Sequence, residues 1–139
     1  MVRRDLAAAK VARATGWLEA AESRFRLSEA EFLADSQQRD LATFYLFLAI
    51  QECIDLAAHW VADGGWTPPD DIASTFEVLA DHGVLPRELA QTLRAATGLR
   101  NRIAHGYALL DHRRLHTEAR QGIAGLRHFL LAIAQAAGL

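Results

Sequence analysis

Apolar residues recur every three or four positions along nearly the whole chain, and no alternating, strand-like pattern competes with this period. The first such stretch predicts a helix over about residues 4–34. Its apolar stripe comprises Leu6, Val11, Ala14, Leu18, Ala21 and Phe25. A second stretch begins near residue 39 or 40 and continues to about residue 62. It is apolar on several sides, which is typical of a central helix.

A loop follows at residues 63–69, because neither its Gly-Gly pair nor its Pro-Pro pair continues a helix. Asp70 or Asp71 can cap a short third helix that extends to about residue 81. Gly83 lies just beyond that helix and is expected to end it.

Two longer helices complete the pattern. Pro86 suits the first turn of a helix over about residues 87–105, and Gly106 stands where left-handed backbone dihedrals commonly end helices. Asp111 then caps a last helix over about residues 112–137. Because short connections make consecutive helices antiparallel, the sequence predicts an all-α, four-to-five-helix antiparallel bundle.

Composition narrows the class of protein. The chain has 139 residues, enough for one domain with a buried core, and we expect residues 1–139 to form it. Its formal net charge is −2, whereas proteins held to nucleic acid by bulk electrostatics carry a large basic excess. Any contact with nucleic acid must therefore be local. The single cysteine, Cys53, excludes an internal disulfide, and its apolar neighbours predict a small buried hydrophobe.

Neither a signal peptide nor a membrane span is expected. Two arginines follow Met1 and Val2, but no uninterrupted apolar run stands behind them. The longest apolar stretches are interrupted by Gln51, Glu52 and Asp55, too early for a membrane span. We therefore expect a cytoplasmic protein.

The end of the fourth predicted helix carries the most informative residues. At about 100° per residue, Asn101 and His105 share a face almost opposite the apolar stripe, so His105 points away from its own core. Arg100 lies about 140° round from His105, and Arg102 is angularly nearer. Helical geometry alone does not choose between the two arginines. Tyr107 follows just beyond Gly106.

A guanidinium beside an imidazole suits chemistry on a phosphodiester, in which arginine holds the phosphate and histidine moves a proton. Each residue also has a plain structural interpretation. A histidine at a helix C-terminus is stabilised by the helix dipole, arginines often line a solvated face, and Tyr107 could pack over the helix end.

The run from Arg100 to Tyr107 resembles the R-x4-H-x-Y pattern of the HEPN superfamily, specifically the HepT-like (DUF86) toxins of prokaryotic HepT/MNT toxin–antitoxin pairs. The segment Leu48–Asp55, the Pro-containing loop and Asp111 after the tyrosine are also similar to that family, over about residues 40–129. Leu99 departs from it, since the family often has an aromatic residue there.

The resemblance implies a metal-independent endoribonuclease that uses the ribose 2′-hydroxyl of RNA, possibly transfer RNA, as the nucleophile. Arg100 and His105 would be catalytic, with Asn101 and Arg102 supporting them. It implies no metal and no cofactor, and the sequence has no carboxylate cluster at metal-binding spacing. It further implies a two-fold symmetric homodimer in which two copies of the motif face each other, consistent with His105 pointing off its own core.

The resemblance also implies a protein partner. In HepT-like toxins the cognate antitoxin is a minimal nucleotidyltransferase (MNT) that transfers AMP to the motif tyrosine, here Tyr107. Neutralisation by binding alone is the alternative to AMP transfer. The alternative function is a catalytically silent HEPN-like dimer that binds a nucleotidyltransferase or a nucleotide. A third is a plain helical interaction module whose motif is accidental.

Other polar groups are weaker candidates. His112 and His116 are four residues apart, the spacing of a metal pair, but a solvated face is the favoured interpretation. An acidic residue of the stripe Glu52, Asp55 and His59 is expected to pair with a motif arginine rather than to act in catalysis. The three tryptophans are too dispersed to stack bases and are expected to pack in the core.

Overall fold

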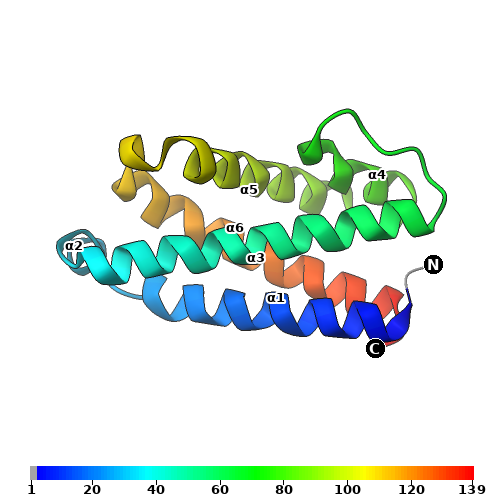
Figure 1. Ribbon diagram of the computed structural model, residues 1–139, viewed down its shortest axis with the longest axis horizontal. Helices are drawn as coiled ribbons and strands as arrows, with labels where there is room; N and C mark the ends of the chain where they lie inside the picture. The colour runs from blue at the N-terminus through cyan, green and yellow to red at the C-terminus, as the bar shows by residue number, and fades with distance from the viewer. Residues whose placement is uncertain (1–2) are drawn as a thin grey trace.

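A computed structural model describes residues 3–139, so Met1 and Val2 of the N-terminal segment lie outside the described residues. Helices alone, with no strand, form the secondary structure of this part of the chain (Figure 1). The elements are α1 (Arg4–Phe25), α2 (Glu29–Ala34), α3 (Ser36–Asp63), the 3-10 helix η1 (Ile72–Ser74), α4 (Thr75–Asp81), α5 (Arg87–Gly106), the 3-10 helix η2 (Tyr107–Leu109) and α6 (His112–Ala136).

The four long helices run up and down, as the short connections predicted (Figure 1). Helix α3 is central: it packs most extensively along α1 and also contacts α4, α5 and α6. Both described ends of the chain lie at one end of the bundle, and the junction between α5 and α6 lies at the other (Figure 1). The predicted all-α antiparallel bundle is confirmed.

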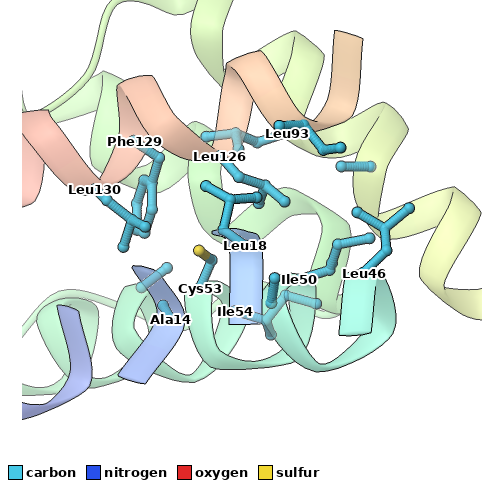
Figure 2. Close-up of a cluster of buried hydrophobic side chains, with 14 of the residues drawn as sticks. Ala14, Leu18, Leu46, Ile50, Cys53, Ile54, Leu93, Leu126, Phe129 and Leu130 are labelled. Carbon is cyan, nitrogen blue, oxygen red and sulfur yellow. The ribbon is translucent and has the colours of Figure 1, made fainter. Parts of the chain in front are cut away.

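The core is built from the apolar faces of all four long helices. Figure 2 shows Ala14 and Leu18 of α1 close to Ile50 and Cys53 of α3 and to Phe129 of α6. All five side chains are at most 1% exposed. Burial of each large apolar side chain stabilises the fold by about 1.5–3 kcal/mol. Burial also raises the pKa of the Cys53 thiol, so this residue is the buried hydrophobe that its neighbours predicted.

The prediction of one helix over residues 4–34 is wrong. The chain breaks after Phe25 and restarts at Glu29, because Ser28 forms a capping box. The Ser28 hydroxyl accepts a hydrogen bond from the Glu31 N–H at 3.2 Å, and the Glu31 carboxylate accepts one from the Ser28 N–H at 3.2 Å. Two backbone donors at the start of α2 are thereby satisfied, which favours a new helix at this point.

The other predicted boundaries hold with small shifts. Helix α3 begins at Ser36, earlier than expected, because Asp35 caps it by accepting from the Gln38 N–H. Asp71 caps η1, just before α4, and Gly83 follows α4 with a φ of +76°. Asp111 caps α6 as predicted.

Gly106 does not end α5 in the way that its position suggested. Its φ is −147° and its ψ is 36°, outside the left-handed region. Helix α5 instead passes directly into the 3-10 turn η2, which begins with Tyr107. His105 and Tyr107 are therefore carried by one nearly continuous helical segment.

Helix α3 is longer than the sequence pattern indicated. With 28 residues and a mean hydropathy of 1.5 in its most apolar part, it is long and apolar enough to span a membrane by length and composition alone. Half of that part is buried inside the bundle, as the core helix of a globular protein would be. Gln51, Glu52 and Asp55 thus interrupt its apolar character without ending the helix.

Candidate active site

The last turns of α5 present the motif as the helical period predicted. Leu99 and Ile103 are buried against the core, at 3% and 7% exposed. Asn101 and His105 are exposed on the opposite face. His105 is therefore accessible to a ligand or to another protein molecule, and the prediction that it points away from its own core is confirmed.

Arg100 is half-buried between α5 and α3, and neutral groups hold it. Its Nε donates to the Gln51 side-chain oxygen at 2.9 Å, and its Nη1 donates to the Asn101 side-chain oxygen at 2.9 Å. Its guanidinium carbon lies 5.3 Å from the centre of the Phe47 ring, a cation–π contact. Among residues 3–139, no carboxylate forms an ion pair with Arg100. Its positive charge remains available to an incoming anion.

A second hydrogen bond fixes the orientation of Gln51. The Gln51 amide nitrogen donates to a carboxylate oxygen of Asp55 at 3.1 Å. Because an ionised carboxylate can only accept hydrogen bonds, Asp55 keeps the amide nitrogen on its own side and leaves the Gln51 oxygen facing Arg100. Asp55 therefore acts on the motif arginine through an intermediate glutamine.

Arg102 lies on the other side of the motif and is paired. Its guanidinium donates to Glu118 of α6, which also accepts from Arg114. Arg102, Asn101 and His105 line one cavity of about 490 Å³, together with Leu99, Gly106, Leu109, Leu110, Asp111, Arg114, Leu115 and Glu118. Arg100 is not part of this lining and reaches it through its hydrogen bond to Asn101. The two arginines thus differ: Arg102 forms an ion pair with Glu118, which it shares with Arg114, whereas Arg100 forms no ion pair with a carboxylate among the described residues.

Tyr107 faces α3 rather than the cavity. Its hydroxyl donates to a carboxylate oxygen of Asp40, and its ring contacts His112 edge to face with centres 6.0 Å apart. Burial, then the hydrogen bond and the negative charge of Asp40, raise the pKa of Tyr107 to about 12. The side chain is still 40% exposed. The phenol is accessible, and its hydroxyl hydrogen is donated to the Asp40 carboxylate.

The family assignment rests on the whole bundle as well as on this motif. The family model described as "Ribonuclease HepT-like" matches residues 16–133. The chain belongs to the HepT-like ribonuclease family. The match extends from the middle of α1 to near the end of α6 and so includes every residue of the candidate site.

Two relatives of this HepT-like chain are described as putative RNases of Archaeoglobus fulgidus. One is 38% identical over 69 residues, which cover 49% of this chain and 52% of the relative. The other is 29% identical over 94 residues, which cover 68% of this chain and 70% of the relative. The chain therefore spans about half the length of the first of these relatives.

Solved structures show the same fold at low sequence identity. A tri-AMPylated Shewanella oneidensis HEPN toxin in complex with an MNT antitoxin superposes with a TM-score of 0.84 at 21% identity, covering 94% of this chain and 98% of the toxin. A toxin–antitoxin complex with AMP-PNP gives a TM-score of 0.85 at 20% identity, with the same coverage. The Bacillus subtilis YutE, described as a cytosolic protein of unknown function, gives 0.77 at 15% identity, covering 92% and 88%.

Sequence reasoning missed three residues that contact the motif. Gln51, Asp40 and Glu118 contact Arg100, Tyr107 and Arg102, respectively. The sequence predicted that an acidic residue of the stripe on the second predicted helix pairs with a motif arginine. Within that stripe, Glu52 instead forms an ion pair with Arg13 at 3.5 Å, and Asp55 reaches Arg100 only through Gln51. The four-residue spacing of Gln51 and Asp55 was the available signal.

The solvated-face interpretation is wrong for His116. This residue is 4% exposed, and its Nε2 lies 2.8 Å from the carbonyl oxygen of Leu27, at the break between α1 and α2. Its ring packs against Phe32 with centres 5.1 Å apart. Helix α2 covers this face of α6, which the single predicted helix could not do. No group of three potential metal-ligating side chains occurs within residues 3–139.

The prediction that the tryptophans pack in the core holds for Trp60, whereas Trp17 and Trp66 are partly buried and pack against the core. Trp60 is buried, Trp17 stacks on Tyr45 with ring centres 5.8 Å apart, and Trp66 stacks on His82 with centres 3.7 Å apart.

Proposed function

We propose that this HepT-like protein is a metal-independent endoribonuclease with one HEPN-like domain over residues 1–139. The observation that carries the proposal is the availability of Arg100: a half-buried guanidinium held by Gln51, Asn101 and Phe47, with no carboxylate neutralising it among the described residues. Exposed His105 lies beyond Asn101 on the same helix.

In the proposed reaction, the ribose 2′-hydroxyl attacks the adjacent phosphorus, and the 5′-oxygen leaves with a proton. His105 moves the proton, which typically contributes about 10²–10⁴-fold to the rate. Arg100 stabilises the charge that develops on the phosphorane oxygens. Asn101 accepts a hydrogen bond from Arg100 and lines the same cavity as His105 and Arg102. The expected product is a 2′,3′-cyclic phosphate.

Cleavage of a labelled single-stranded RNA tests this proposal, with transfer RNA as the first natural substrate to try. His105→Ala and Arg100→Ala should each reduce cleavage by at least about 100-fold, with the helical content of the protein unchanged. Cleavage should persist in EDTA. Full cleavage by either variant would refute the assigned roles. Absence of cleavage by the wild-type protein, together with binding of a nucleotidyltransferase or nucleotide, would favour the catalytically silent dimer.

The active form is proposed to be a homodimer. His105 is exposed, and Leu109, which lines the same cavity, is 91% exposed, so an apolar side chain beside the motif has no cover within its own chain. Mixing the Arg100→Ala and His105→Ala proteins tests the arrangement. If one protomer supplies the arginine and the other the histidine, the mixed dimer regains one complete site and part of the activity. Monomeric behaviour in light scattering at micromolar concentration would exclude this arrangement.

A minimal nucleotidyltransferase is the proposed antitoxin, and AMP transfer to Tyr107 is the proposed means of neutralisation. Support comes from the similarity to a tri-AMPylated HEPN toxin bound to an MNT antitoxin and from the exposure of the Tyr107 phenol beside the motif. Mass spectrometry after co-expression with the product of the adjacent gene, expected to be a minimal nucleotidyltransferase, should locate AMP on Tyr107. Neutralisation without any AMP on the protein would indicate inhibition by binding alone. The cytoplasm is the proposed compartment of both proteins.

A further inference from the structure

Tyr107 is tied to a carboxylate that has no part in the proposed cleavage reaction. Asp40, in the second turn of α3, accepts a hydrogen bond from the Tyr107 hydroxyl, although 67 residues separate the two in sequence. The Asp40 side chain is 56% exposed. It is therefore accessible to solvent, and it contacts the oxygen to which AMP is proposed to be transferred.

Two further side chains, Arg39 and His112, surround the hydrogen bond between Tyr107 and Asp40 and leave it intact. Arg39 Nε lies 4.0 Å from the Asp40 carboxylate, and Arg39 Nη1 donates to the carbonyl oxygen of Leu33 at 3.0 Å, which fixes the guanidinium. From α6, the His112 ring packs against the phenol. Burial and the nearby Arg39 lower the pKa of His112, which favours its neutral form at physiological pH.

Within residues 3–139, Asp40 is thus the carboxylate that contacts the Tyr107 hydroxyl and is placed to receive its proton. Asp111 is a nearby carboxylate, and its negative charge acts to raise the pKa of His112. It is engaged elsewhere, because it accepts hydrogen bonds from the backbone N–H groups of Arg113 and Arg114. The neutral His112 has its Nδ1 buried without a hydrogen-bond partner in the described part of the chain, and its ring contacts the phenol edge to face.

We propose that Asp40 is the general base for AMP transfer to Tyr107, supplied by the toxin itself rather than by the nucleotidyltransferase. This inference rests on the proposed AMP transfer. The Tyr107 oxygen attacks the α-phosphorus of ATP, the bond to the β-phosphate oxygen breaks, and pyrophosphate leaves. The phenolic proton passes to the Asp40 carboxylate and from there to solvent. The products are tyrosyl-AMP and pyrophosphate.

A base accelerates the transfer because the phenol is almost entirely protonated at physiological pH. With a pKa of about 12, only on the order of one Tyr107 in 30,000 is tyrosinate at pH 7.5. If a base removes the proton as the O–P bond forms, the reaction does not depend on the small fraction of tyrosinate. Burial and the Asp40 hydrogen bond raise the phenol pKa in the resting protein, and the same Asp40 carboxylate accepts the proton during transfer.

The same contact is lost once AMP is attached. The ester oxygen of tyrosyl-AMP carries no hydrogen and cannot donate to Asp40, and the new phosphate places a negative charge beside the carboxylate. Modified Tyr107 is therefore released from α3.

The experiment measures the initial rate of AMP incorporation from ATP labelled at the α-phosphate, with a minimal nucleotidyltransferase of the MNT type as the enzyme. All toxin variants carry His105→Ala so that they can be expressed safely. Asp40→Asn is the test variant, because asparagine can still accept the phenolic hydrogen bond but is not a base. Asp81→Asn, in an exposed ion pair with Arg87 at the opposite end of the bundle, is the matched control.

Asp40→Asn should slow incorporation by about 10²–10⁴-fold at pH 7, and Asp81→Asn should not. The ratio of the wild-type rate to the Asp40→Asn rate should fall about tenfold per pH unit from pH 7 to 9, because the variant depends on spontaneous tyrosinate. A lost structural contact would leave that ratio independent of pH. In a Tyr45→Phe background, ultraviolet titration should show Tyr107 ionising at lower pH in the Asp40→Asn protein.

The outcomes separate the two claims. If the toxin with Asp40 intact takes up no AMP, the proposed modification is wrong, and the role of Asp40 is refuted with it. If that toxin is modified and Asp40→Asn is modified at the same rate, or with a pH-independent ratio, only the role of Asp40 is overturned.

Discussion

Replacement of Gln51 by alanine tests how much the positioning of Arg100 contributes to cleavage, because the variant keeps the arginine and its positive charge. Gln51 supplies the 2.9 Å hydrogen bond to Arg100 Nε, and Asp55 orients the amide that makes it. A hydrogen bond to a charged group contributes about 1.5–3 kcal/mol. If all of it positions the guanidinium in the transition state, Gln51→Ala should lower kcat/KM for RNA cleavage by about 10- to 150-fold.

The assay is steady-state cleavage of a fluorogenic RNA, with Gln37→Ala as the matched control. Gln37 is a glutamine of the same helix with an exposed side chain, so its loss should leave kcat/KM unchanged. Asp55→Ala should give a smaller loss than Gln51→Ala, because the glutamine remains but is free to rotate. If Gln51→Ala keeps wild-type kcat/KM while Arg100→Ala abolishes cleavage, the positioning argument is wrong.

Three further predictions concern the surroundings of the site. Glu118→Gln should raise RNA affinity by up to about fivefold, since the partly exposed ion pair with Arg102 contributes about 1 kcal/mol or less. Fluorescence anisotropy with cleavage-inactive protein measures the affinity, and weaker binding would contradict the prediction. Ser28→Ala should lower the free energy of unfolding by about 0.5–2 kcal/mol through loss of the capping box. His116→Leu should cost about 1–3 kcal/mol, because the Leu27 carbonyl loses its partner. Urea denaturation tests both, and unchanged midpoints would refute them.

The local parts of the site follow from the sequence because they depend on helical period. The apolar stripe of α5 fixed which way Asn101 and His105 point, and both are exposed as predicted. The same period left the choice between Arg100 and Arg102 open, since it describes one helix and not its neighbours. Glu118 of α6 forms an ion pair with Arg102, whereas the neutral Gln51 of α3 holds Arg100 by a hydrogen bond.

The contacts that sequence reasoning missed join residues far apart in the chain. Arg100 and Gln51 are 49 positions apart, and their contact depends on how α3 packs along α5, which no single-helix pattern encodes. His116 is buried because α2 turns back over α6, and that turn depends on a short capping signal at Ser28. The signal is a serine followed three residues later by a glutamate. The apolar period continues through this point, so the pattern alone predicts one uninterrupted helix.

The apolar character of α3 has a consequence for how the chain folds during synthesis. An isolated segment of this length and hydropathy is prone to aggregate or to be taken for a membrane anchor while it emerges from the ribosome. Helix α1, which makes the most extensive contact with α3, is synthesised before it. Helix α1 is therefore available to bury the apolar surface of α3 as soon as α3 is synthesised. We expect the α1–α3 hairpin to form while the rest of the protein is still being translated.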